Sequence, residues 1–446
     1  MHCKTTFLQI KKQNFPQVPD PTLGKMPVGT YNDSPMTDLL PIALPAWLTP
    51  QLMVSALVIV IVLHVALGAA AYGIWLERKL SAWVQDRVGP NRVGPFGLLQ
   101  PIADGLKLIT KEEFRPRGVD VALFSIAPFL SVIPAMVGIA AIPWAGGLDL
   151  SAFGLEGVVR LQGADFNLGI VFLLASASLG VYGVTLGGWA SNSKYSFFGG
   201  LRAGAQMISY EIPMGICLLC VVLAAGTLRM DEVIRQQTDH GWFLLHMPLP
   251  AIMFYICMLA EANRAPFDLA EAESELVGGW HTEYSSMKWA SFFLAEYIHV
   301  FVGSAFFAVI FMGGWSVNPL PFGPDLPDIN PASWGVWGGI LLPLVQFGVL
   351  MGKVVLMVAL TMMVRWTLPR FRFDQLMRLA WEGLIPASLV CLLVTSAVVY
   401  FGMQEFMFVG GVASIVLVLL GRPFLPQDET NRRIGMIGSR FSPVSA

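Results

Sequence analysis

The sequence has few charged residues for its length. Only 13% of its 446 residues are Asp, Glu, Lys or Arg, whereas 55% are hydrophobic, and the mean hydropathy is +0.63. A soluble protein would have about a quarter charged residues. The composition therefore excludes an ordinary soluble enzyme and indicates an integral membrane protein. No hydrophilic stretch is long enough for a second folded core, so we expect one membrane domain.

Cysteines and nucleotide-binding motifs are also scarce. Of the five cysteines, only Cys217 and Cys220 have the spacing of a redox or metal site. They lie in an apolar run, which favours buried small side chains over a metal cluster. No glycine-rich dinucleotide or phosphate-binding motif is present, and no basic tract suggests nucleic acid as a partner. We therefore expect no metal, redox centre or nucleotide on this chain.

Long apolar runs make up most of the sequence, and many approach the roughly 20 residues of a transmembrane helix. They lie near residues 51–75, 121–145, 167–190, 205–227, 245–263, 289–314, 336–364, 385–401 and 404–421. Because the last two are short and adjoining, the predicted fold is an all-α polytopic membrane protein with eight or nine transmembrane helices. We expect a transmembrane domain over 46–421, a flexible polar extension over 1–45 and a tail over 422–446.

Lysine and arginine are concentrated in alternate loops. The loops after the first, third, fifth and seventh runs hold sixteen, whereas the intervening loops hold three. Because positively charged loops remain on the cytoplasmic side, we expect large charged cytoplasmic loops and an outside N-terminus. Four arginines in the tail favour a cytoplasmic C-terminus, and so nine spans. The opposite loops, such as Asn318–Pro331, are rich in Pro and Gly, and are predicted to be plain connectors.

The first charged loop contains a short repeat, Arg87-Val-Gly-Pro followed by Arg92-Val-Gly-Pro. Gly-Pro steps break helices and form turns, so the two arginines are predicted to be presented on a stiff loop. Arginine suits anionic and planar partners. Two interpretations remain open, namely docking on a partner protein and contact with lipid headgroups.

Two segments have the spacing of amphipathic helices. In the first charged loop, Leu98, Leu99, Ile102, Leu106 and Ile109 recur at helical intervals. This pattern predicts a helix that lies along the membrane surface. A second such helix is predicted after the seventh run, where Phe373, Leu376, Met377 and Ala380 share one face.

An acidic segment separates the fifth and sixth apolar runs. It contains Glu261, Asp268, Glu271, Glu273, Glu275 and Glu283. If residues 268–276 are helical, Asp268, Glu271 and Glu275 lie on one face. Clustered carboxylates at the edge of hydrocarbon have raised pKa values, because burial and like charge both disfavour ionisation. The segment is therefore a candidate site of proton exchange, although a solvated acidic loop is the alternative.

Single ionisable residues also lie within the apolar runs. Glu211 is followed by Pro213, a combination that can open a polar site in a kinked helix. Glu296, His299, Lys353 and His64 are further candidates. For each, a structural polar contact is the alternative to a functional role.

The segments at 77–95 (ERKLSAWVQDRVGPNRVGP) and 261–297 (EANRAPFDLAEAESELVGGWHTEYSSMKWASFFLAEY) resemble two signatures of one family. This is the H subunit of bacterial NADH-quinone oxidoreductase, respiratory complex I, whose mitochondrial counterpart is NADH dehydrogenase subunit 1. The resemblance runs from about residue 45 to 421. It implies a multi-pass subunit of the bacterial inner membrane that couples quinone reduction to proton translocation. It also implies FMN and iron–sulfur clusters on partner subunits, with quinone as the substrate.

The resemblance also assigns roles to individual residues. The protonatable link from quinone to the proton pathway would be formed by Glu261, Asp268, Glu271, Glu273 and Glu275, with Glu211 on the inward route. The quinone chamber and its docking surface would involve Arg87, Arg92, Arg264 and Phe267, and more weakly Lys353. The first and sixth apolar runs would flank the quinone entrance. The expected partners are peripheral-arm quinone-site subunits, small membrane-arm subunits and membrane lipids.

Three other functions are compatible with parts of this pattern. The membrane subunit of an energy-converting hydrogenase would have the same fold without quinone, but its acidic signature is less full. A secondary transporter would show inverted repeats, and none is evident. A purely structural anchor for peripheral subunits would leave the acidic segment without a role.

Overall fold

The computed structural model describes residues 50–149, 158–271, 276–320, 338–403 and 407–421. The predicted extension over 1–45 and the tail over 422–446 lie outside these residues, as do Glu273 and Glu275. Within the described part, seven helices are long and apolar enough to cross a membrane. The predicted all-α polytopic membrane fold is therefore confirmed.

The long helices coincide with seven of the nine predicted runs. They are α1 (Pro50–Val84), α3 (Val121–Gly138), α4 (Gly169–Ala190), α5 (Lys194–Ala225), α10 (Ser286–Phe311), α11 (Gly338–Thr367) and a continuous segment over 373–400. The other two runs form α8 (Pro248–Glu261) and α14 (Met407–Gly421). At about 1.5 Å per residue, the 14 residues of α8 extend roughly 21 Å, less than the roughly 30 Å of a bilayer core. Eight or nine spans and the outside N-terminus therefore stay predictions.

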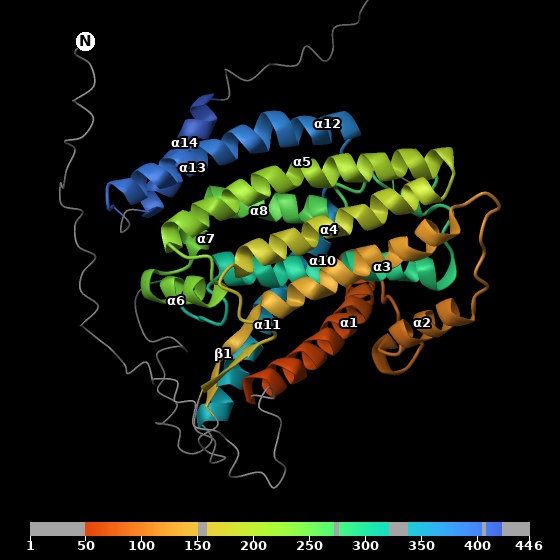
Figure 1. Cartoon of the computed structure of the whole chain (residues 1–446), viewed down its shortest axis with the longest axis horizontal. Coiled ribbons are helices and arrows are strands. Elements are labelled where there is room, and N and C mark those ends of the chain that lie inside the picture. Colours follow the sequence, from red (N-terminus) through yellow and green to blue (C-terminus); the bar gives the residue numbers. More distant parts are fainter. Residues whose placement is uncertain (1–49, 150–157, 272–275, 321–337, 404–406, 422–446) are drawn as a thin grey trace, which may run out of the picture. The chain divides into compact units, whose positions relative to one another are not determined.

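Helix α10 is the most enclosed of the long helices. In its apolar window, 78% of the residues are buried inside the protein. It packs against α1, α3 and α11, and it lies behind α3 and α4 in Figure 1. A helix that is apolar all round belongs in the interior of a membrane protein, because neighbouring helices replace lipid on every side. Side chains on α10 are therefore in position to connect several other helices.

Helices α3, α4 and α5 approach one another closely because α4 carries glycines at the contacts. Figure 1 shows the three running side by side. A Cβ atom built on Gly183 would lie 2.6 Å from the backbone nitrogen of Ser131 in α3. One built on Gly188 would lie 2.6 Å from the backbone oxygen of Ser196 in α5. Small residues permit this close packing of helices in membranes.

The loops that were predicted to be plain connectors contain secondary structure. The second run ends as helix at Ala141, and Pro143 begins an antiparallel hairpin of β1 (Pro143–Asp149) and β2 (Val158–Gln162). Between α5 and α8 lie α6 (Met230–His240) and α7 (Phe243–His246). Helix α6 forms because Met230, Val233 and Ile234 share a face that is buried in the core. The prediction of simple connectors is therefore wrong for these two loops.

Of the two predicted surface helices, the first is a separate helix and the second is part of a longer helix. Helix α2 (Gln100–Thr110) begins at a proline-containing first turn, and its apolar residues are exposed in the isolated chain. In contrast, α12 (Phe373–Arg378) continues through a π-helical turn (Leu379–Leu384) into α13 (Ile385–Tyr400). Leu376 and Ala380 do face the core, as predicted. The second element is thus the first turns of a long helix.

We expect Gly183→Ala to destabilise the protein, because the added methyl group would collide with the backbone of Ser131 at the contact between α3 and α4. The matched control is Gly215→Ala in α5, where a Cβ atom would meet nothing within 4 Å. Alanine favours a helix over glycine by about 1 kcal/mol, so the control should be neutral or slightly stabilising. Thermal unfolding of the purified protein would measure both variants. Equal midpoints for the two would show that α3 and α4 do not pack this closely.

Candidate functional site

The acidic segment begins where α8 ends, and the chain there is held by one buried amide. The Nε2 atom of Gln206 in α5 donates to the carbonyl oxygens of Ala260 and Phe267, each at 2.8 Å, and lies 3.2 Å from Oδ1 of Asn263. Gln206 is fully buried. A buried amide must satisfy its donors, so this side chain fixes the first turns of the segment against α5.

Only the two ends of the predicted helix over 268–276 are among the described residues. Residues 268–271 are not helical, and the backbone of Asn263, Val277 and Gly279 has positive φ. A Cβ atom on Gly279 would lie 1.8 Å from the carbonyl oxygen of Ala270, so the two sides of the segment touch. Asp268 and Glu271 lie close enough to interact electrostatically. Glu275, the third member of the predicted acidic face, lies outside the described residues.

Four carboxyl groups from three parts of the chain meet at this site, which we call the carboxylate cluster: Glu77 of α1, Asp268 and Glu271 of the acidic segment, and Glu296 of α10. Glu77, Asp268 and Glu296 are 7%, 7% and 8% exposed. Carboxylates buried to this degree are unfavourable unless they are paired, hydrogen-bonded or protonated. Ion pairing and hydrogen bonding are both found here.

Pairing comes from three arginines. Arg365 of α11 lies 2.6 Å from Glu77, and Arg370 lies 3.2 Å from Asp268. Arg264 of the acidic segment lies 3.1 Å from Glu296. The guanidinium of Arg264 is itself buried, with its carbon 4.2 Å from the ring centroid of Tyr297. Stacking on an aromatic face stabilises a desolvated cation.

One hydrogen bond and several charge interactions tie the cluster together. The hydroxyl of Tyr297 donates to Glu77 at 2.7 Å, which joins α10 to α1. Glu296 lies close enough to Glu271 and Asp268 to interact with both electrostatically. The acidic segment is therefore coupled to α10 through charge.

Asp268 is poised to titrate near neutral pH. Burial raises the pKa of Asp268 to about 7, and the negative charge of Glu271 adds to the rise. The nearby guanidinium groups of Arg370, Arg365 and Arg264 oppose it. One oxygen of Asp268, Oδ1, is buried without a hydrogen-bond partner among the described residues. Interacting groups of this kind titrate as a set.

Two of the predicted acidic residues form a second, separate pair. Glu211 of α5 accepts a hydrogen bond from the hydroxyl of Ser178 in α4, and its charge acts on Glu261 at the end of α8. Within the described part of the chain, neither carboxyl forms an ion pair. Four of the predicted acidic residues thus occupy two places: Glu211 and Glu261 form one pair, and Asp268 and Glu271 belong to the carboxylate cluster.

The predicted arginine loop is folded as expected. Gly89 and Gly94 have positive φ, and Nζ of Lys79 donates to the carbonyl of Val88 at 3.2 Å. Arg87 and Arg92 are exposed on this loop, and no contact of either with the carboxylate cluster is found among the described residues. Phe267, in contrast, is buried, and its ring stacks on that of Phe371 at 5.5 Å.

The remaining ionisable candidates within the apolar runs contact backbone carbonyl groups or a neighbouring helix. Nζ of Lys353 donates to the carbonyl oxygens of Met312, Gly314 and Ser316 just beyond α10, and lies 4.2 Å from the ring centroid of Trp242. These contacts neutralise carbonyl groups at a helix C-terminus. Nδ1 of His64 lies 2.7 Å from the carbonyl of Val60, one turn away. A Cβ atom on Gly180 would lie 3.2 Å from Nε2 of His299, so that ring packs against α4.

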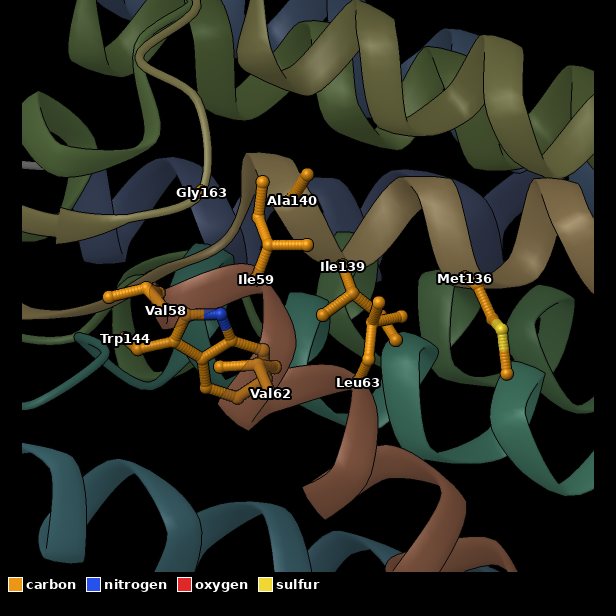
Figure 2. Close-up of a pocket in the computed structure, with 9 residues that line it drawn as sticks. All are labelled: Val58, Ile59, Val62, Leu63, Met136, Ile139, Ala140, Trp144 and Gly163. Atoms are coloured by element: carbon orange, nitrogen blue, oxygen red, sulfur yellow. The ribbon is translucent and has the colours of Figure 1, made fainter. Parts of the chain in front are cut away.

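The thiols and the pocket in Figure 2 add no chemistry to this site. Cys217 and Cys220 are buried free thiols, as the sequence predicted. No group of three or more His, Cys, Asp or Glu that could hold a metal ion occurs among the described residues. The pocket in Figure 2 is lined by apolar side chains of α1, such as Val58 and Val62, with Trp144 of β1. It lies nearer the N-terminal end of α1 than Glu77 does.

Four residues of this site were not predicted, namely one carboxylate of the cluster and three partners of its carboxyl groups. The sequence identifies Glu77 only as the end of the first run, and Arg365 and Arg370 only as loop charges. It assigns no role to Tyr297. Glu77 is the first residue of one matched signature and Tyr297 the last residue of the other, so their positions in these two segments were the available signal.

Comparisons with known proteins indicate the same family over most of the chain. A family profile described as NADH dehydrogenase matches residues 56–396. The chain is 43% identical over 346 residues to the NADH-quinone oxidoreductase H subunit 1 of Cytophaga hutchinsonii, covering 78% of this chain and 96% of that protein. It is 47% identical over 337 residues to the H subunit 1 of Geobacter metallireducens, covering 76% and 94%. It is 44% identical over 339 residues to NADH-quinone oxidoreductase subunit 8 of Rhodothermus marinus, covering 75% and 94%. The chain therefore belongs to the family of NADH-quinone oxidoreductase H subunits.

Proposed function

We propose that this chain is the membrane subunit of a proton-pumping NADH-quinone oxidoreductase in which the carboxylate cluster forms the membrane-side part of the quinone chamber. In this proposal the cluster couples quinone reduction to proton translocation. The observation that carries it is the buried ion pair of Arg264 and Glu296 within the carboxylate cluster, because it joins the acidic segment to the most enclosed helix. A merely solvated acidic loop would not bury three carboxyl groups beside three arginines.

The proposed mechanism is electrostatic. Reduction of a quinone draws on nearby protons and creates negative charge on the way to the quinol. At an effective dielectric constant of about 20, a unit charge about 4 Å away acts on a carboxyl group with roughly 4 kcal/mol. That corresponds to about three pKa units. Asp268 would respond first, and its charge interactions with Glu271 and Glu296 would carry the response to α10.

The arginines set the resting state of the cluster. Arg365 and Tyr297 compensate Glu77, so this carboxylate would serve as a fixed charge. Arg264 is held by its stacking on Tyr297 and can favour an ionised Glu296 without moving. In this way a change of protonation at Asp268 or Glu271 alters the field at Glu296. The Glu211–Glu261 pair, and Glu273 and Glu275 beyond the described residues, would extend the route.

Other surfaces would serve assembly and substrate entry. The exposed Arg87 and Arg92 lie on a stiff loop that suits docking on acidic peripheral subunits. Those partners would carry FMN and the iron–sulfur clusters, and the assembly would lie in the bacterial inner membrane. The quinone would enter between α1 and α10, where α2 leaves its apolar face uncovered. The names of the relatives favour this enzyme over an energy-converting hydrogenase.

We expect Glu271→Gln to lower quinone reduction and proton pumping together by at least about tenfold. The amide cannot carry the charge through which Glu271 acts on Asp268 and Glu296, and it cannot exchange a proton. NADH oxidation by an artificial electron acceptor should be unchanged, because it does not require this subunit. Both rates can be measured on the purified complex in proteoliposomes.

The matched control for this experiment is Glu382→Gln, which changes an exposed carboxylate in the π-helical turn before α13. It should leave all three activities as they are in the unmodified complex. Normal coupled activity in Glu271→Gln would mean that the cluster is structural and that the proposed role is wrong.

Arg370→Gln should shift the titration of Asp268 to higher pH. The pKa of Asp268 is already raised to about 7, so its carboxyl is protonated below and ionised above this pH. Removal of the neighbouring cation destabilises the ionised form, and the proton is then retained to higher pH. Infrared difference spectra of the protonated carboxyl band would follow this titration, with Asp268→Asn to assign the band. Arg370→Lys should shift it less, and no shift in Arg370→Gln would rule out the pairing.

A further inference from the structure

Two consecutive serines at the start of α10 have conformations that are unfavourable for their positions in a helix. Ser285 occupies the N-cap position, but its side chain does not cap α10. Ser286 has a φ of 55°, in the left-handed region that residues other than glycine seldom adopt. Each departure is unfavourable on its own, because a helix start without a side-chain cap and a backbone in the left-handed region both reduce stability. Such departures persist where the surrounding structure compensates them.

The compensation comes from the end of α2, which lies about 170 residues earlier in the chain. The hydroxyl of Ser286 lies 2.9 Å from the carbonyl oxygen of Leu108 and 3.0 Å from that of Lys111. A single hydroxyl proton serves these two acceptors in turn or jointly. The last carbonyl groups of a helix have no partner within it, so Ser286 satisfies groups that α2 itself cannot.

The neighbouring side chains strengthen the same connection. The backbone N–H of Phe114 donates to the hydroxyl of Ser285 at 3.0 Å, in place of the cap that Ser285 would otherwise form. Nζ of Lys288 lies 2.6 Å from Glu113. Ser286 is only 5% exposed, so water does not compete freely for its hydroxyl. We call the three residues Ser285, Ser286 and Lys288 the α2 clasp.

The other end of α2 is attached to α1. Nη1 of Arg78 lies 2.9 Å from Asp104 in α2, and Nε1 of Trp75 donates to the carbonyl of Phe96 at 3.3 Å. Helix α2 thus connects the ends of α1 and α10, which also carry Glu77 and Glu296. Little else holds it, since none of its residues is buried in this chain.

We propose that Ser286 is a positioning residue that fastens the C-terminal end of α2 to the start of α10. It thereby sets how α2 lies beside the proposed quinone entrance between α1 and α10. The part of this inference that concerns quinone rests on the proposed function, whereas the attachment itself does not. Ser286 also follows directly on the acidic segment, so a displacement of that segment would be transmitted to α2 through the clasp.

Two substitutions separate the hydroxyl from the backbone strain. Ser286→Gly removes the hydroxyl and relieves the strain, whereas Ser286→Ala removes the hydroxyl and keeps the strain. Hydrogen exchange in the assembled complex would report on the amides of residues 106–116. We expect exchange about fivefold faster in both variants, as for the loss of one hydrogen bond. The matched control is Ser291→Ala, whose exposed hydroxyl bonds only to Met287 within α10, and it should exchange at the original rate.

Steady-state kinetics complete the test. Both variants should raise KM for a short-chain quinone severalfold with kcat unchanged, because α2 would be misplaced while the chemistry is intact. Unchanged hydrogen exchange in both variants would overturn the proposal. Faster exchange in Ser286→Ala with the original rate in Ser286→Gly would also overturn it, because only the backbone strain would then matter. Faster exchange with an unaltered KM would overturn the positioning role. Absence of quinone reduction in the unmodified complex would instead refute the proposed function and leave the exchange result standing.

Discussion

The burial of ionisable carboxyl groups at the ends of apolar helices is the constraint on which this structure depends. An isolated buried carboxylate costs several kcal/mol, and even a paired one contributes little net stability. The protein therefore surrounds Glu77, Asp268 and Glu296 with three arginines and a tyrosine hydroxyl. Such an arrangement is not needed for packing, since apolar side chains would pack as well. It is what a site requires if its protonation is to change.

Helix α10 carries much of this arrangement. Its first turn holds the end of α2, its third and fourth turns carry Glu296 and Tyr297, and the carbonyls beyond its last turn are bound by Lys353. Because the helix is enclosed along its length, its side chains meet partners on several sides. A rigid enclosed helix can transmit a local change of charge or position between elements that do not touch each other.

Several elements could be predicted because their signal is local. Apolar runs of sufficient length predict helices in a membrane, and the Arg-Val-Gly-Pro repeat predicted a tight loop at Gly89 and Gly94. The amphipathic spacing predicted α2. The predictions that were wrong concern segments whose structure depends on contacts with residues far away in the sequence. The segment with Met230 and Val233 was expected to be a connector, but it forms a helix because these side chains are buried in the core. Residues 268–271 adopt a turn-like, non-helical conformation just after Phe267, whose carbonyl is bound by Gln206.

The helical membrane fold and the family could both be predicted from the sequence, since the apolar runs and the two long signatures are local features. The acidic segment could be found in the same way, because its density of carboxylates does not depend on the fold. Which carboxylates meet does depend on it. Glu77 and Arg365 are 288 positions apart, and no periodicity relates them. The packing of whole helices brings such side chains together, so the partners of a buried charge are set by the fold and not by neighbours in the chain.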